Sequence, residues 1–141
     1  MRTEEKNLWQ WLKNGADSLE DIHMQRIENV VKKNTPDVEG TYKKRSFVIE
    51  LKSINKVYEL RKKLTAGQAM FLYKRWSVGG SAWLLVEVEG LRRYLIPGLY
   101  AVELLYPVKE KTLAVLSACT SPQASAVEML EAIHDEIETR L

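Results

Sequence analysis

The segment Phe47 to Lys52, with the sequence Phe-Val-Ile-Glu-Leu-Lys, carries two opposite charges in an otherwise apolar run. Alternate side chains of a strand share a face, so Glu50 and Lys52 lie on one face and the large apolar residues between them on the other. Placing such charges in a sheet costs free energy unless they pair, face water or bind something. The pattern therefore indicates either an ion pair or a binding site.

A third charged residue, Asp37, is separated from Glu50 by twelve residues. If Lys43 and Lys44 form a two-residue hairpin turn, the numbers of paired residues sum to 87, which places Asp37 opposite Glu50. A shift by two residues places Asp37 opposite Lys52 instead. Either register puts all three side chains on one face. Two carboxylates whose Cβ atoms are ~5 Å apart repel each other unless a cation lies between them.

A divalent metal ion is the natural partner for this pair of acids. Asp37 and Glu50 would bind it with the backbone carbonyl of Leu51, and a hard ion such as Mg²⁺ or Mn²⁺ suits oxygen ligands. The metal would acidify a bound water and neutralise charge on a scissile phosphate, while Lys52 would orient that water or stabilise the transition state. The alternative is a surface hairpin with an ordinary Glu50 to Lys52 ion pair, and spacing alone does not separate the two interpretations.

The first part of the chain supplies the elements around these residues. Leu8 to Asn14 is predicted to form a short amphipathic helix that ends at Gly15. A capping box at Ser18 predicts a second helix, in which apolar residues from Leu19 to Val31 recur at helical spacing until Asn34-Thr35-Pro36. From Asp37 the period changes to two, so 38–42 and 46–53 are predicted to be the strands of a β-hairpin.

The second part alternates helices and strands. Thr65 is predicted to cap a helix over 66–76, closed by Gly79-Gly80, while the charged stretch 56–63 is left unassigned. The apolar run 82–88 is typical of a strand buried on both faces, and 91–96 is predicted to follow it as a strand. A short helix is expected over 99–105, 112–119 is ambiguous, and 124–141 is predicted to be a helix with an acidic outer face. The class is therefore α/β or α+β, with a mixed central sheet and a β-hairpin, flanked by helices.

Composition limits the possible functions. The chain has 141 residues, 45% of them hydrophobic, which fits a single domain. Cys119 is the only cysteine, which excludes an internal disulfide and a cysteine-built zinc site, and the presence of two histidines disfavours a histidine-rich metal site. No apolar run approaches the ~20 residues of a membrane span. We expect a soluble, unexported, cytoplasmic protein with no membrane association and no small-molecule cofactor.

Charge is distributed unevenly along the chain although the net charge is only +2. Residues 1–25 carry three basic and five acidic side chains, 26–93 carry fifteen and seven, and 94–141 carry three and seven, which gives −2, +8 and −4. A basic middle between acidic ends is typical of a face that binds a polyanion, although a solvated lysine-rich surface produces the same pattern.

The combination Pro36-Asp37, twelve residues, then Glu50-Leu51-Lys52 resembles the signature of the PD-(D/E)XK nuclease superfamily. Around it, Arg26 to Asn29, Thr35 to Val38 and Gly67-Gln68 at the start of a helix resemble the VRR-Nuc and phage-type branch. The resemblance covers about residues 18–96, and the helical extension at about 122–141 lies outside it. Many relatives have glycine before Pro-Asp, where this chain has Asn34-Thr35, and the linker 55–63 is longer and more charged than expected.

This resemblance implies a restriction-endonuclease-like core and a magnesium-dependent deoxyribonuclease. Asp37 and Glu50 would bind the metal and Lys52 would assist catalysis. Glu28, from the first core helix, would complete the acidic cluster, and Gln68 would line the site. The implied protein hydrolyses phosphodiester bonds, at branched or flap DNA in replication or repair of phage or bacterial type. We also expect a homodimer, because one small chain covers few phosphates.

Further residues are candidates for DNA contacts. Gln68, Leu72 and Arg75 share one helical face, so a Gln68 near the metal places Arg75 where a phosphate could lie. For Lys43, Lys44 and Arg45 two interpretations stay open: contacts to backbone phosphates, or a solvated basic turn. Trp76 and Trp83 are predicted to belong to the core.

Two other functions remain open at this point. One is a catalytically inactive nuclease-fold module that binds DNA or serves as a structural partner. The other is an unrelated domain in which the motif is a coincidence.

Overall fold

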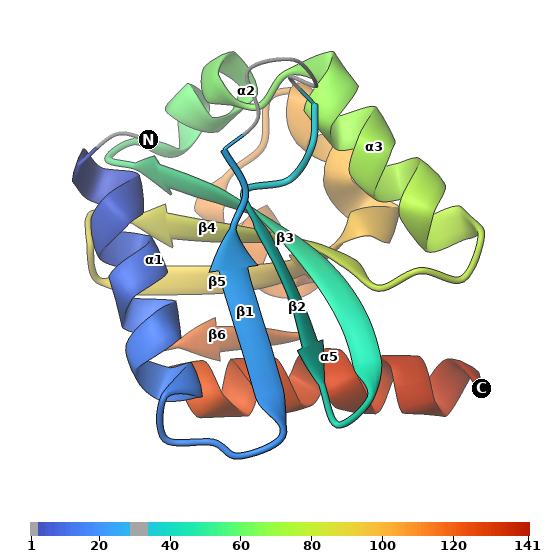
Figure 1. The fold of residues 1–141 in the computed structure, drawn as a ribbon. Coiled ribbons are helices and arrows are strands. Elements are labelled where there is room, and N and C mark those ends of the chain that lie inside the picture. Colours follow the sequence, from blue (N-terminus) through green and yellow to red (C-terminus); the bar gives the residue numbers. More distant parts are fainter. Residues whose placement is uncertain (1–2, 29–33) are drawn as a thin grey trace.

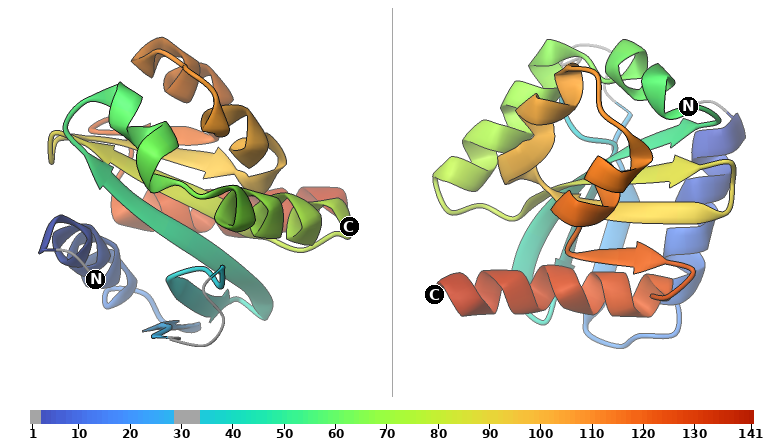
Figure 2. Two further views of the ribbon diagram at one scale, coloured as in Figure 1. Left: turned by 90° about the horizontal axis from the view of Figure 1, so that it is seen from above. Right: turned by 180° about the vertical axis from the view of Figure 1, so that it is seen from behind.

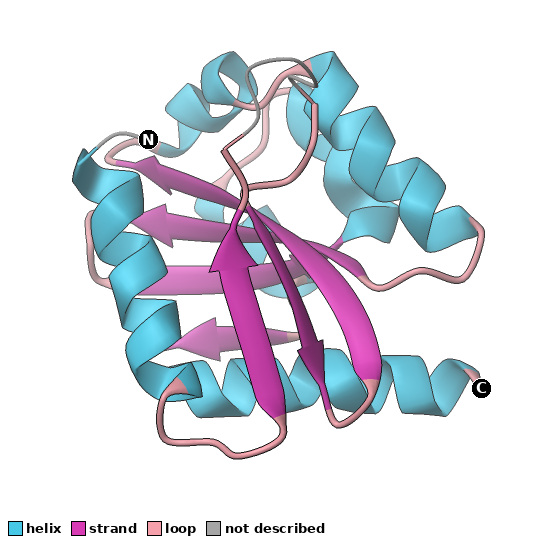
Figure 3. Cartoon of the chain, viewed as in Figure 1, coloured by secondary structure: helices cyan, strands magenta, loops and turns pink. Residues whose placement is uncertain are grey.

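The computed structural model describes residues 3–28 and 34–141, and it is built around one six-stranded sheet (Figure 1). The strands follow one another in the sheet in chain order: β1 (Ile22–Arg26), β2 (Val38–Tyr42), β3 (Arg45–Ile54), β4 (Ala82–Val88), β5 (Arg92–Pro97) and β6 (Cys119–Ser121). Neighbours pair antiparallel except β3 and β4, which are parallel. The expected mixed sheet flanked by helices is confirmed (Figure 3).

Parallel strands need a crossover connection, and here it supplies the helices next to β3. The chain passes from β3 through η1 (Val57–Glu59), α2 (Leu60–Lys63) and α3 (Ala66–Ser77) to β4. The predicted cap of α3 is present, since the Thr65 side chain accepts a hydrogen bond from the backbone N–H of Gln68. The charged stretch 56–63, for which the sequence predicts no element, forms η1 and α2. Its Leu60 is fully buried, which holds this stretch against the core.

Helices cover both faces of the sheet. One apolar cluster joins the sheet to α1 (Thr3–Ala16) and α5 (Ala126–Arg140), and the other joins it to α2, α3, η2 (Gly98–Leu105) and α4 (Glu110–Leu116). Seen from behind in Figure 2, η2 and α4 lie in front of the sheet and α1 lies behind it. All seven residues of β4 are buried, as its apolar sequence predicts.

The hairpin has the register that a two-residue turn predicts. Val38 pairs with Ile49 and Tyr42 pairs with Arg45, so paired numbers sum to 87. Lys43 and Lys44 have φ angles of +48° and +71°, the left-handed conformation that a tight hairpin turn requires at both central positions. On β3, the apolar alternate residues face the cluster with α1 and α5.

The predicted helix after Ser18 is wrong. Residues Ile22–Arg26 form β1, which pairs antiparallel with β2, and the part of the prediction at 29–33 lies outside the described residues. Half-buried and exposed residues alternate along β1, so the side chains of Ile22 and Met24 lie on the same face of the sheet. Pairing with the open edge of β2 satisfies the backbone groups of both strands, and this long-range contact overrides the helical spacing.

The C-terminal segment is part of the core. α5 begins after its Ser125 cap and lies so close to α1 that a Cβ added at Gly15 would stand 2.5 Å from Cβ of Ala126. Met129, Leu130 and Ile133 are buried in the same cluster as the apolar face of β3. Within 3–28 and 34–141, none of the helices has the length and apolar character needed to cross a membrane.

Candidate active site

Asp37 is fixed at the point where β2 begins. Its backbone carbonyl accepts a hydrogen bond of 2.7 Å from the N–H of Ile27, and its carboxylate Oδ2 accepts one of 2.9 Å from the N–H of Leu51. The side chain therefore continues the pairing between β2 and β3 beyond the last backbone pair. This places Asp37 beside Glu50, as the hairpin register predicts.

Glu50 and Lys52 are buried side by side on β3. Their side chains are 3% and 9% exposed, and Nζ of Lys52 lies 3.4 Å from Oε2 of Glu50. Burial, and next the charge of Asp37, raise the pKa of Glu50 from 4.5 to about 9, against the opposing effect of Lys52. Without a further cation, Glu50 is therefore protonated at neutral pH and shares a hydrogen bond with the Asp37 carboxyl group.

The backbone carbonyl of Leu51 points toward the same side of β3 as the Asp37 carboxylate. In a strand, the N–H and C=O of one residue point to the same side, and these sides alternate along the chain. Val48 donates its N–H to Ser81 next to β4, whereas Leu51 donates to Asp37 on the opposite side. The Leu51 carbonyl is thus directed to the β2 side of β3, beyond the end of the β2 pairing.

This donor set fits a hard divalent cation. Two carboxylates and a carbonyl are ligands that Mg²⁺ and Mn²⁺ accept, with water and substrate oxygens filling the remaining positions. A cation between Asp37 and Glu50 would replace the proton that the pair holds without it. The part of the chain that the structure describes contains no group of three or more His, Cys, Asp or Glu side chains arranged to hold a metal. The site is therefore a pair of acids rather than a closed cage.

Glu28 is not brought into this pair. It follows β1 instead of lying on a helix, its side chain is 82% exposed, and its carboxylate lies 3.1 Å from Nη2 of Arg26. Because the N–H of Ile27 donates to the carbonyl of Asp37, the backbone of the next residue, Glu28, lies near the site. The side chain of Glu28, however, is directed to Arg26 and solvent.

Gln68 lies on the first turn of α3, against the loop that leads to Asp37. A Cβ added at Gly67 would meet Oδ1 of Asn34 at 2.4 Å, so the absence of a side chain lets this loop touch the helix. The side-chain oxygen of Gln68 accepts a hydrogen bond of 3.1 Å from the N–H of Thr65. Its amide NH₂ group donates no hydrogen bond within the described residues.

The basic turn lies at the far end of the hairpin from Asp37. Six strand positions separate Lys43 from Asp37, which is about 20 Å at ~3.3 Å per residue. Arg45 forms an ion pair of 2.8 Å with Glu138 of α5, and Nζ of Lys43 lies 5.0 Å from the centre of the Tyr42 ring.

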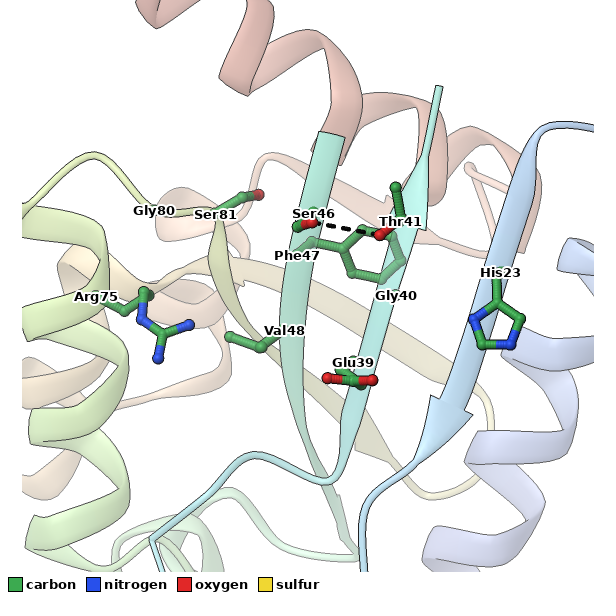
Figure 4. Close-up of a pocket in the computed structure, with 10 residues that line it drawn as sticks. All are labelled: His23, Glu39, Gly40, Thr41, Ser46, Phe47, Val48, Arg75, Gly80 and Ser81. Atoms are coloured by element: carbon green, nitrogen blue, oxygen red, sulfur yellow. Dashed lines mark hydrogen bonds between the residues drawn. The ribbon is translucent and has the colours of Figure 1, made fainter. Parts of the chain in front are cut away.

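A groove lies between the hairpin and the C-terminal end of α3 (Figure 4). It has a volume of about 260 Å³, and Arg75 is on one wall. The lining residues that sequence reasoning did not select are His23, Glu39, Gly40, Thr41, Ser46, Phe47, Val48, Gly80 and Ser81. Period-two alternation in the predicted register would have placed Glu39 and Thr41 on the face of Asp37, but β1 and the turn before β4 carry no such signal.

Comparison with known proteins finds similarity in structure but none in sequence families. No family model matches the chain, and no curated protein matches it. A similar solved structure is the 1.6 Å structure of Hjc from Archaeoglobus fulgidus, a Holliday junction resolvase from an archaeal hyperthermophile. The two chains are 16% identical over 68% of this chain and 75% of that one, with a TM-score of 0.47.

Proposed function

We propose that this protein is a metal-dependent endonuclease that hydrolyses phosphodiester bonds of DNA. One observation carries the proposal: Asp37, Glu50 and Lys52 meet on one face of the hairpin, with two carboxylates in contact and an amine 3.4 Å from one of them. Burying two adjoining acids is costly, and a divalent cation that binds both recovers this cost. Mg²⁺ or Mn²⁺ is the proposed cofactor.

Each residue has a distinct proposed task. Asp37 and Glu50, with the Leu51 carbonyl, hold the metal, which when bound supplies charge neutralisation at the phosphate and an acidified water. Lys52 donates a hydrogen bond to the attacking water or to a phosphate oxygen. Gln68 offers its amide NH₂ to the substrate from α3, whereas Glu28, which is exposed and paired with Arg26, has no proposed task.

The proposed substrate is branched or flap DNA in replication or repair of phage or bacterial type, within the cytoplasm. The resemblance of the segments Arg26 to Asn29, Thr35 to Val38 and Gly67-Gln68 to the VRR-Nuc and phage-type branch supports this setting. Lys43, Lys44 and Arg45 are proposed as outer phosphate contacts, which implies little sequence preference. We propose a homodimer as the active form, and light scattering of the purified protein at several concentrations tests it.

The decisive experiment is cleavage of plasmid and branched oligonucleotides with Mg²⁺ or Mn²⁺. Asp37→Ala and Lys52→Ala should each lower the single-turnover rate by on the order of 100-fold or more, because each removes a group that acts on the reacting phosphate. The exposed residues Glu131 on α5 and Lys111 on α4 give matched controls. Glu131→Ala and Lys111→Ala should cleave at the wild-type rate.

The second candidate function is an inactive DNA-binding or structural module. The contacts of Glu50 with Asp37 and Lys52 favour it, since a protonated Glu50 that is bound to both neighbours also satisfies these buried groups without any metal. Metal-dependent cleavage that both substitutions abolish supports the enzyme. DNA binding by wild type without cleavage under any of these metal conditions contradicts it and supports the module.

A further inference from the structure

The groove beside Arg75 opens on the same face of β3 as the candidate active site. Ser46, Val48 and Glu50 occupy alternate positions of β3, so their side chains point to one face. Val48 is about 7 Å and Ser46 about 13 Å along the strand from Glu50. Beyond Ser46 the strand ends at the basic turn with Lys43 and Lys44. A nucleic-acid strand with one phosphate at Glu50 would enter this groove within a few nucleotides.

Arg75 is an oriented cation without a carboxylate partner within the described residues. Its guanidinium lies 4.9 Å from the centre of the Phe71 ring, and in Figure 4 it points from α3 toward Val48 on β3. The acid among the lining residues is Glu39, whose carboxylate accepts a hydrogen bond of 2.5 Å from Gln25. A guanidinium held in this way is suited to bind a phosphate by two parallel hydrogen bonds.

The turn before β4 fixes the position of Arg75. A Cβ added at Gly80 would stand 2.5 Å from Cδ of Arg75, so only glycine lets the arginine stem lie against the turn. The N–H of Gly80 donates to the Arg75 carbonyl at 2.8 Å, and its carbonyl accepts from Nη2 of Arg140 at 3.1 Å. The C-terminal ends of α3 and α5 therefore both contribute to the orientation of this wall.

Hydroxyl groups line the opposite wall. Oγ1 of Thr41 and Oγ of Ser46 lie 3.3 Å apart across β2 and β3 (Figure 4). One of the two hydroxyls donates a hydrogen bond to the other, and the second can rotate to donate to a ligand. An anion between Arg75 and this pair would be bound by one charge and by a neutral donor, as phosphates of a nucleic-acid backbone commonly are.

We propose that this groove binds a backbone phosphate of the DNA strand that is cleaved, a few nucleotides from the scissile bond, between Arg75 and the Thr41 and Ser46 hydroxyls. The inference rests on the proposed nuclease function and deepens it. Arg75 acts as a positioning residue: it sets the register of the strand over Glu50 and Lys52 and takes no part in the bond cleavage.

The test combines Arg75→Gln with DNA in which one phosphate at a time is replaced by an uncharged methylphosphonate. Binding is measured without turnover, in the Asp37→Asn background with Mn²⁺. One position within a few nucleotides of the scissile bond should weaken binding about 10-fold with Arg75 present and not at all with Arg75→Gln. The slope of log K against log salt should fall by about one in Arg75→Gln. Lys111→Gln, on α4, is the control, because it also removes one positive charge.

The results separate this inference from the function on which it rests. Equal effects of Arg75→Gln and Lys111→Gln, or methylphosphonate effects that do not depend on Arg75, overturn the groove proposal even if wild type cleaves DNA. A methylphosphonate effect at one position that disappears in Arg75→Gln supports phosphate binding in the groove even if wild type cleaves no DNA, in which case the nuclease proposal fails and the groove is a DNA-binding site. Arg75 is exposed, so thermal denaturation should show the variant folded as wild type is.

Discussion

Glu50 is the residue whose chemistry depends most on its surroundings. The same carboxyl group would be an ordinary ionised acid on a surface strand. Here its burial and the neighbouring Asp37 raise its pKa to about 9, so it gains a proton when no cation is bound. Protonation and metal binding are alternative ways of relieving one repulsion.

This shift predicts how the stability of the metal-free protein changes with pH. Between about pH 4.5 and 9, folded Glu50 holds a proton that the unfolded chain releases, so the folded state binds more protons. The free energy of unfolding should therefore fall as pH rises through this window, by up to about 1.4 kcal/mol per pH unit. Urea denaturation in EDTA at a series of pH values measures it.

Glu50→Gln is the control for that measurement. Glutamine has nearly the same shape and no proton to release, so the pH slope in this window should disappear. A slope that is the same in wild type and Glu50→Gln would show that another group is responsible. Adding Mn²⁺ to wild type at pH 7 should release protons into a weakly buffered solution, because binding displaces the proton from Glu50.

At the scale of elements, α3 holds two groups that we propose to contact the substrate. Its N-terminal turn carries Gln68 and its C-terminal turn carries Arg75, about 10 Å apart along the axis at 1.5 Å per residue. The capping box at Thr65 fixes the first of these side chains, since its oxygen is used in the cap and its NH₂ group is not.

The cap and the substrate contact of Gln68 can be separated by two substitutions. Gln68→Glu preserves the cap oxygen but replaces the NH₂ donor by a charge, so stability should be nearly unchanged while the cleavage rate falls about 10-fold. Thr65→Ala should lower the free energy of unfolding by about 1 kcal/mol, with a smaller effect on rate. Urea denaturation and single-turnover cleavage measure both. Equal rates for Gln68→Glu and wild type would remove Gln68 from the site.

Elements with local signals were predictable from the sequence. The turn residues Lys43 and Lys44 determine the hairpin register, and with it the meeting of Asp37 and Glu50. Thr65 marks the start of α3, and the uninterrupted apolar run of β4 shows that both of its faces are buried.

Elements determined by distant contacts were not predictable. β1 is an edge strand whose apolar residues also fit helical spacing, and its partner β2 decides between the two. The wrong helix also changes the expected position of Glu28, because a helical origin would have directed that side chain differently. The groove wall at Gly80 depends on contacts between α3, α5 and the turn before β4. No local sequence pattern predicts these contacts.

At the scale of the whole molecule, the strand with the candidate site lies between two different environments. One face of β3 contacts the apolar layer formed by α1 and α5, and the other presents Glu50 and Lys52 toward the hairpin face and α3. The chemistry on one face therefore depends on packing on the other, since β3 has to be held rigid for Asp37 and Glu50 to keep their positions.

This dependence predicts a large effect of a substitution outside the site. Ile133 of α5 is 2% exposed in that layer, so Ile133→Ala should lower the free energy of unfolding by about 2–5 kcal/mol. Val115 of α4 is 75% exposed, and Val115→Ala should change it by less than about 0.5 kcal/mol. Urea denaturation compares the two. Similar values for both variants would mean that α5 does not stabilise the domain.

The layer of α1 and α5 also has a consequence for biosynthesis. The first and the last helix of the described chain together cover the apolar side of β3, which is translated well before α5. While the ribosome is still adding α5, Phe47, Ile49 and Leu51 of the nascent polypeptide lack part of their cover, so chaperones can bind there. Asp37 and Glu50, at the open end of the hairpin, therefore reach their final arrangement only once α5 has been synthesised and packs against β3.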